Sequence, residues 1–183
     1  MEDFFSGPGW LVFQRRQDDS VSFDRNWNEY ADGFGDLNGN FWIGNDNLAL
    51  ITSGDTIYEL RIELQDWDNE WRYARYASFR VEDASTEYVL RLGSFTLGDA
   101  GDSMTYNNGS PFTTPDNDND QTHHHCGTLY GRSGWWFNSC SYAFLNNPYS
   151  HHSTVDTFGG IVWSDWHGRQ YSLKRVEMKL RPV

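Results

Sequence analysis

Hydrophobic and polar positions alternate along the chain with two periods, and these predict strands and short helices. Gly9–Arg16 (GWLVFQRR) and Thr56–Gln65 (TIYELRIELQ) alternate apolar and polar side chains, which is the period of a half-buried strand. Asp24–Gly33 (DRNWNEYADG) places Trp27 and Tyr30 three residues apart and ends in glycine, which predicts a short helix. The first third of the chain is therefore expected to mix both kinds of element.

The remaining periodic segments complete a sheet. Phe41–Thr52 predicts a second short helix, and Trp71–Val81 and Thr86–Leu92 predict two strands at hairpin spacing. Gly160–Val183 returns to strand-like alternation in YSLKRVEMKLRP. We expect this last strand to rejoin the early ones, which gives an α+β fold with a central, mostly antiparallel sheet.

Residues 93–159 form a long loop-rich stretch between these two parts of the pattern. Gly, Asn, Asp, Ser and Thr dominate it, and a segment of this length without periodicity is normally functional or disordered. Trp135, Trp136 and Phe137 indicate that it is ordered, and we expect the two tryptophans to lie in the core. We predict that residues 93–159 are a subdomain within a single domain, 1–183.

Composition narrows the class of partner. The chain has 183 residues, with 9 Trp, 10 Tyr and 12 Phe, so its core is expected to be largely aromatic. Its 26 acidic residues exceed its 14 basic ones and give a net charge of −12, which argues against nucleic acid and anionic membranes as partners. No apolar run approaches the ~20 residues of a membrane span, so membrane insertion is not expected.

Three alternating aspartates, Asp116, Asp118 and Asp120, concentrate hard oxygen ligands in an Asn/Thr/Pro-rich segment, as calcium requires. An EF-hand is excluded, because Gln121 stands where its loop needs glycine and Gly127 where it needs glutamate. The expectation is an irregular calcium site completed by backbone carbonyls and water. A solvated acidic loop without metal is the plainer alternative.

The two cysteines follow at once, and we predict that Cys126 and Cys140 form a disulfide that holds the intervening loop. His123–His125 and His151–His152 raise a zinc alternative, since imidazole and thiolate are zinc ligands. Consecutive residues cannot easily face one metal, and a disulfide-bonded cysteine is no ligand. Zinc is therefore disfavoured.

The segment after Met1 is acidic and does not have the pattern of a signal peptide. The chain is then either cytosolic or a part of a secreted protein, and the cysteine pair with the calcium site favours the secreted, extracellular alternative. No ordered Ser/His/Asp set, carboxylate pair or nucleotide-binding loop stands out, so an enzyme is not expected.

The chain resembles the fibrinogen-related domains, which are the C-terminal globular domains of fibrinogen chains, ficolins, tachylectins, tenascins and angiopoietins. The matching pieces, in family order, are GWLVFQRR, NWNEYADGFGDLNGNFWIGNDNL, YELRIEL, AGDSM, DNDND, SGWWFNSC and YSLKRVEMKLRP. The resemblance covers nearly the whole chain, although the N-terminal strand and first disulfide usual in the family have no counterpart. It implies a fibrinogen C-terminal-like fold.

The resemblance also implies a calcium site. The two ligand aspartates of the family correspond to Asp118 and Asp120, and its two carbonyl ligands correspond to Thr122 and His124. Asp116 matches a flanking acidic position and is expected to act through water. With so few carboxylates, the site is expected to bind calcium at extracellular concentrations.

A ligand pocket beside the calcium site is implied as well. In the family the second cysteine follows a cis peptide bond, here Ser139–Cys140, which turns backbone N–H groups towards the acetyl group of N-acetylated sugars. A non-proline cis bond costs ~2.5–4 kcal/mol, so the disulfide and the calcium loop would have to hold it. Tyr130 stands where some members have an aromatic wall, or else belongs to the core.

This chain departs from the family at several pocket positions. Ser141 replaces a common histidine, Thr157 and Phe158 replace a frequent Tyr-Ala pair, and Arg169 replaces an aromatic residue. The loop between the cysteines is one residue longer than is typical. The expected ligand residues are Tyr130, Ser139, Cys140, Ser141, Thr157 and Phe158.

Two functions follow from the resemblance. The first is a secreted, calcium-binding recognition lectin of innate immunity that binds acetylated or other microbial glycans. The second is a protein–protein interaction module of a matrix or signalling protein. Capture of a cationic peptide N-terminus, as in fibrinogen, is disfavoured because Ser141 and Thr157–Gly159 carry no charge. Family members usually oligomerise through upstream segments, so an oligomer is expected for the full-length protein.

Overall fold

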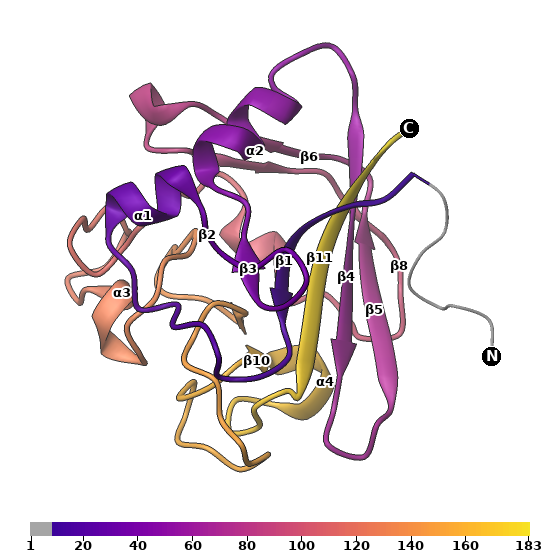
Figure 1. The fold of residues 1–183 in the computed structure, drawn as a ribbon, viewed down its shortest axis with the longest axis vertical. Coiled ribbons are helices and arrows are strands. Elements are labelled where there is room, and N and C mark those ends of the chain that lie inside the picture. Colours follow the sequence, from indigo (N-terminus) through magenta and orange to yellow (C-terminus); the bar gives the residue numbers. More distant parts are fainter. Residues whose placement is uncertain (1–8) are drawn as a thin grey trace.

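The computed structural model describes residues 9–183, and its centre is a seven-stranded antiparallel sheet (Figure 1). The strand order is β2-β3-β1-β11-β4-β5-β8. The strands are β1 (Leu11–Arg16), β2 (Phe34–Gly35), β3 (Phe41–Trp42), β4 (Tyr58–Gln65), β5 (Trp71–Tyr76), β8 (Phe95–Leu97) and β11 (Arg175–Pro182). The last strand lies between β1 and β4, so the predicted non-local closure of the sheet is present.

Two further strand pairs and several short helices complete the fold. The pairs are β6 (Phe79–Val81) with β7 (Leu90–Leu92), and β9 (Ala143–Phe144) with β10 (Val162–Trp163). The α-helices are α1 (Trp27–Asp32), α2 (Asn45–Thr52), α3 (Cys126–Leu129) and α4 (Ser164–His167), with 3-10 turns at Ala84–Thr86 and Thr105–Asn107. In Figure 1 the helices α1, α2 and α3 lie to one side of β1, β11 and β4.

Helix α1 begins where the sequence signals it. Asn26 caps the helix by accepting from the N–H of Glu29, and the Glu29 side chain accepts in return from the N–H of Asn26. This capping box satisfies two N–H groups that a helix leaves unpaired. The predicted helix over Asp24–Gly33 is therefore found, in a shorter form.

Three predicted elements differ in their bounds. Phe41–Thr52 begins as a strand and turns helical only at Asn45, after Gly44 at φ +106°, where a Cβ would come within 2.7 Å of the Asp32 carbonyl oxygen. Trp71–Val81 is divided into β5 and β6, which belong to different sheets. In Thr86–Leu92 the strand covers only the last three residues, because Glu87 and Tyr88 have left-handed backbone conformations.

One face of the central sheet forms the core. Leu60, Ile62 and Leu64 of β4 pair in register with Leu180, Met178 and Val176 of β11, and all six are buried. The core continues into the loop-rich part of the chain through Trp135, Trp136 and Phe137, which are each 0 % exposed. The two tryptophans are therefore core residues, as predicted.

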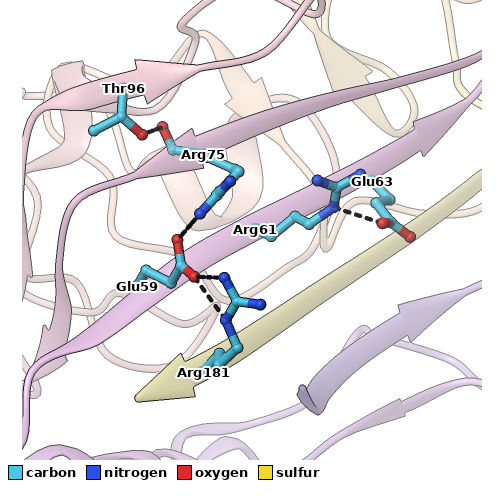
Figure 2. Close-up of polar contacts among 6 residues, drawn as sticks. All are labelled: Glu59, Arg61, Glu63, Arg75, Thr96 and Arg181. Carbon is cyan, nitrogen blue, oxygen red and sulfur yellow. Dashed lines mark hydrogen bonds and ion pairs between the residues drawn. The ribbon is translucent and has the colours of Figure 1, made fainter. Parts of the chain in front are cut away.

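The opposite face of the sheet carries alternating charges. Figure 2 shows Glu59 of β4 between Arg75 of β5 and Arg181 of β11, with Arg61 beside Glu63 on the same strand. Arg181 Nε donates to Glu59 at 2.8 Å, and Arg75 Nε donates at 3.1 Å. Glu59 is 8 % exposed, so its carboxylate is shielded from water although the two arginines are partly exposed, and these bonds link three neighbouring strands.

Replacing Glu59 with Gln is expected to lower the free energy of unfolding by about 1–3 kcal/mol, because two guanidinium groups lose their anionic acceptor. Burial by itself raises the pKa of Glu59, but hydrogen bonds and charges from Arg75 and Arg181 outweigh it and hold the pKa below its ordinary value. The stabilisation is thus present above the pKa of the unfolded chain, about 4.3, and is lost as the pH falls through the folded pKa.

Urea unfolding from about pH 6 down to about pH 3 measures this contribution. The difference between the parent and Glu59→Gln should shrink as the pH falls. Glu70→Gln is the matched control, because Glu70 forms an exposed pair with Arg72 worth about 1 kcal/mol or less. Equal losses in the two variants would contradict the role given to Glu59.

Candidate functional site

The disulfide fixes the centre of the candidate site. Cys126 and Cys140 are bonded, with 5.5 Å between their Cα atoms, as the two-cysteine spacing predicts. Cys126 begins helix α3 and is buried, whereas Cys140 is half-buried. The bond therefore joins the core to a surface loop, and the acidic segment comes directly before it in the sequence.

Asp120 connects the acidic segment to the first cysteine. Its Oδ1 accepts from the N–H of Thr122 at 2.9 Å, and its Oδ2 accepts from the N–H of Cys126 at 2.8 Å. The N–H of Asp120 donates to Oδ1 of Asp118 at 3.3 Å. These bonds curl the backbone so that the two aspartate side chains lie on the same loop, beside the disulfide.

The electrostatics of this loop favour a cation. Partial burial, followed by the neighbouring Asp118 carboxylate, raises the pKa of Asp120 above its ordinary value. The carbonyl oxygens of Thr122 and His124 accept no hydrogen bond from any donor in residues 9–183. The loop thus holds two carboxylates that repel each other, followed in the sequence by two carbonyl groups without a hydrogen bond, and oxygen donors of this kind are the ligands that calcium prefers.

The other residues considered as metal ligands lie elsewhere. Asp116 Oδ1 accepts from the N–H of Trp27 at 2.9 Å and from the Thr114 hydroxyl at 2.7 Å, so this side chain anchors the start of α1. His125 Nε2 contacts the carbonyl oxygen of Thr114, and His151 pairs with Asp19. Within residues 9–183 no three His, Cys, Asp or Glu side chains are grouped so that they could hold a metal, and zinc gains no support.

The backbone at the second cysteine offers hydrogen-bond donors. The N–H groups of Ser139, Cys140 and Ser141 have no acceptor among residues 9–183, although Asn138 N–H donates to the Cys140 carbonyl at 2.8 Å. No peptide bond in the described part of the protein is cis, so the expectation of a cis bond at Ser139–Cys140 is wrong for this structure. The trans form is the one that ordinary peptide energetics favour, by ~2.5–4 kcal/mol.

Two of the predicted ligand residues form an aromatic wall. The rings of Tyr130 and Phe158 meet edge to face at 5.1 Å, and Phe158 stacks on Phe144 at 4.5 Å. Phe158 is only 7 % exposed, whereas Tyr130 is half-buried. Phe158 thus fills the inner part of this region, and Tyr130 presents the more accessible ring.

The remaining predicted residues divide between interior and surface. The Ser141 hydroxyl is buried and lies 3.0 Å from Asn107 Oδ1 and 2.7 Å from the Ala143 carbonyl oxygen, so its side chain supports the loop from within. Thr157 is exposed, and Gln170 Nε2 lies 3.5 Å from its hydroxyl. Ser141 can therefore contribute to ligand binding only through its backbone.

Sequence reasoning missed an exposed aromatic pair beside the second cysteine. The Tyr106 hydroxyl donates to the Ser139 carbonyl at 3.2 Å, and the Tyr106 ring meets that of Tyr142 edge to face at 4.9 Å. The Arg169 guanidinium lies 5.5 Å from the centroid of the Tyr142 ring. Tyr142, two residues after Cys140, could have been found from the sequence, but only the fold brings Tyr106 and Arg169 to the same place.

Comparison with known proteins decides the family. The family model for the C-terminal globular domain of fibrinogen beta and gamma chains matches residues 3–183. The protein belongs to this family. The α+β fold, with its antiparallel sheet and few short helices, is accordingly the fibrinogen-like globe fold, as predicted.

The curated relatives are of several kinds. The chain is 43% identical over 182 residues to angiopoietin-related protein 7 of Bos taurus, covering 97% of the chain and 51% of the relative. It is also 43% identical to ryncolin-4 of Cerberus rynchops, covering 96% and 50%. Fibrinogen C domain-containing protein 1 of Macaca fascicularis is 43% identical, with 97% and 42% covered. The chain thus spans about half the length of these relatives or less.

Solved structures agree. The fibrinogen-like globe domain of human ANGPTL2 has a TM-score of 0.90 at 41% identity, covering 94% of this chain and 80% of that one. Lamprey fibrin D-dimer complexed with the peptide Gly-His-Arg-Pro-amide has a TM-score of 0.89 at 38% identity, covering 95% and 61%.

These relatives are non-enzymatic, in agreement with the prediction for this protein. No helix within residues 9–183 is long and apolar enough to cross a membrane.

Proposed function

We propose that this chain is the recognition domain of a secreted, calcium-binding lectin of innate immunity that binds N-acetylated carbohydrates of microbes. The observation that carries the proposal is the run of three N–H groups at Ser139–Ser141 without an acceptor in residues 9–183. The accessible Tyr130 ring, at the end of the helix that the disulfide joins to Cys140, supports it. An N-acetyl group offers a strong carbonyl acceptor and a small apolar methyl group. These match the N–H donors and the aromatic wall.

The geometry favours a shallow site. Phe158 packs against Phe144 and occupies the inner part of the wall, so the methyl group would contact Tyr130 and the edge of Phe158. Recognition then depends on the backbone donors, whose positions do not vary with side-chain identity. The replacement of the usual histidine by Ser141 is therefore compatible with acetyl binding.

Calcium would be held by Asp118 and Asp120 with the carbonyl oxygens of Thr122 and His124, and Asp116 could contribute only through water. A bound divalent cation supplies positive charge where two carboxylates repel each other. Asp120 also accepts from the N–H of Cys126, so a calcium ion that fixes the Asp120 side chain would also fix the backbone at the disulfide. Calcium is thus proposed to stabilise the ligand loop.

Replacing Asp118 with Asn is expected to abolish stabilisation by calcium. In the parent protein, calcium at about 100 times its Kd should add about 2.7 kcal/mol to the free energy of unfolding, or roughly 5–10 °C in Tm. Asp55→Asn removes the same charge from an exposed position and should keep the full shift. A Tm of the parent that is the same in calcium and in chelator would contradict the site.

The acetyl preference is tested by competition. N-acetylglucosamine should displace the protein from an acetylated polysaccharide, whereas glucose should not, because glucose lacks the acetamide carbonyl. Tyr130→Ala should weaken binding by about tenfold while leaving the domain folded, since this ring is only half-buried. Tyr58→Ala, at a half-buried position on the sheet, is the matched control. Equal competition by both sugars would favour a protein ligand instead.

A protein–protein interaction module is the second candidate. The exposed Tyr106–Tyr142 pair favours it, because exposed tyrosines are common anchors of protein interfaces. The angiopoietin-related relatives are compatible with such a role. The cationic peptide of the lamprey fibrin complex is a poor model, since Ser141 and Thr157–Gly159 carry no negative charge and Arg169, which lies over the Phe158 ring, is itself cationic.

The disulfide supports an extracellular location for this protein, because cytosolic proteins rarely keep such bonds. The net charge of −12 makes nucleic acid an unsuitable partner. Oligomerisation of the full-length protein is proposed by analogy with the family. It would raise the avidity of a shallow, weak sugar site.

A further inference from the structure

Arg169 stands on the rim of the candidate ligand site. Its carbonyl oxygen accepts from the N–H of Phe158 at 2.7 Å, which ties the two segments together. Its guanidinium lies 5.6 Å from the centroid of the Phe158 ring and 5.5 Å from that of the Tyr142 ring. The cation is therefore placed between the aromatic wall and the exposed tyrosine pair.

Ring contacts on both sides of this guanidinium lead to the two segments that the disulfide joins. On one side Tyr142 meets Tyr106, whose hydroxyl donates to the Ser139 carbonyl. On the other side Phe158 meets Tyr130, four residues after Cys126. Arg169 thus borders the surface over which a sugar bound by its acetamide would extend.

The charge of Arg169 is not used within the described residues. No carboxylate in residues 9–183 forms an ion pair with it, and its side chain is exposed. By contrast, Arg132 pairs with Asp24 and Arg91 with Glu82, although both arginines are also exposed. The two ring contacts satisfy none of the N–H donors of Arg169, which remain available for an anion.

We propose that Arg169 makes this site selective for N-acetylated sugars that also carry an anionic group, either a carboxylate or a sulfate. The inference rests on the proposed lectin function and names its ligand class. The acetamide binds the Ser139–Ser141 backbone, and the anion binds the guanidinium fork, which matches the geometry of either group. The net charge of −12 repels anions at long range, but salt at about 0.15 M screens this repulsion beyond about 8 Å. The repulsion therefore does not prevent an anion from binding directly to the Arg169 guanidinium.

The test compares sugars that differ in one group. Binding of N-acetylglucosamine, N-acetylglucosamine 6-sulfate, N-acetylneuraminic acid and glucose 6-sulfate is measured by calorimetry at low and moderate salt. We expect the parent protein to bind at least one of the two acetylated anions about tenfold more tightly than N-acetylglucosamine. A preference for the sulfated sugar or for the carboxylic sugar distinguishes the two sources of charge.

Two variants test whether the preference for anionic sugars depends on Arg169. Arg169→Gln should remove the preference while binding neutral N-acetylglucosamine within about twofold of the parent. Arg80→Gln is the matched control, because Arg80 is exposed, forms no ion pair within residues 9–183 and lies on β6, outside the site. It should keep the preference in full.

The outcomes separate this inference from the lectin function. Equal affinity for neutral and anionic acetylated sugars, or an unchanged preference in Arg169→Gln, would overturn the selectivity and leave the lectin function intact. Glucose 6-sulfate binding as tightly as its acetylated counterpart would show a general anion site and overturn the proposal. Absence of binding to every acetylated sugar would overturn both.

Discussion

Trp136→Ala is expected to lower the free energy of unfolding by about 3–5 kcal/mol, one of the two largest effects predicted for this protein. The Trp136 side chain is 0 % exposed, and its ring lies within 6.0 Å, centroid to centroid, of four other aromatic rings. Its Nε1 donates to the Tyr88 carbonyl at 2.9 Å. The variant would thus lose packing and leave a buried acceptor unpaired.

The effect should extend to the ligand site. The Trp136 carbonyl accepts from Asn107 Nδ2 at 2.8 Å, and Asn107 in turn holds the Ser141 hydroxyl. Trp166→Ala is the control, because Trp166 is half-buried and stacks on His167 at the surface. Urea unfolding should give a loss for Trp136→Ala at least twice that for the control. Similar losses would show that the segment between the cysteines is not anchored through Trp136.

The sheet could be predicted from the sequence because its strands carry a strong period-2 pattern. In β4 and β11 every second residue must face an aromatic and aliphatic core, so Leu60, Ile62, Met178 and Leu180 mark the strands without further information. The return of the last strand to the early ones was also predicted, whereas its place between β1 and β4 is known only from the structure. These strands can be predicted because the alternation that defines each of them lies within its own segment of the sequence.

The parts that were missed depend on tertiary contacts. β5 and β6 read as one strand, but the backbone leaves the sheet at Ala77, whose N–H donates to the Ser94 carbonyl. The helix expected from Phe41 starts late because Gly44 passes the backbone of α1 at close range. Neither partner could be identified from local pattern alone.

In the candidate site, too, some features could be predicted from the sequence and others depend on tertiary contacts. The spacing of the cysteines, and the aspartates before them, indicated the disulfide and the acidic loop. The inward turn of Ser141 and the burial of Phe158 could not be read from the sequence, because both depend on residues distant along it, Asn107 and Arg169. The trans form of the Ser139–Cys140 bond likewise corrects an expectation taken from resemblance alone.

Removing the disulfide by replacing Cys126 and Cys140 with Ala is expected to lower the free energy of unfolding by about 3 kcal/mol. The bond closes a loop with a sequence separation of 14, and releasing it returns that much loop-closure entropy to the unfolded state. For a domain of this size the loss corresponds to a fall in Tm of roughly 6–12 °C. Thermal unfolding monitored by circular dichroism measures it.

The functional loss should be larger than the loss of stability explains. Asp120 bonds to the N–H of Cys126, and the unpaired donors lie next to Cys140, so the bond holds the acidic loop and the N–H groups in one arrangement. At a temperature where the double variant is still folded, both the calcium shift and acetylated-sugar binding should be strongly reduced. Glu59→Gln, with a comparable loss of stability but an intact loop, should retain both. If the double variant keeps full sugar affinity while folded, the loop is ordered by its own contacts, and the disulfide serves stability alone.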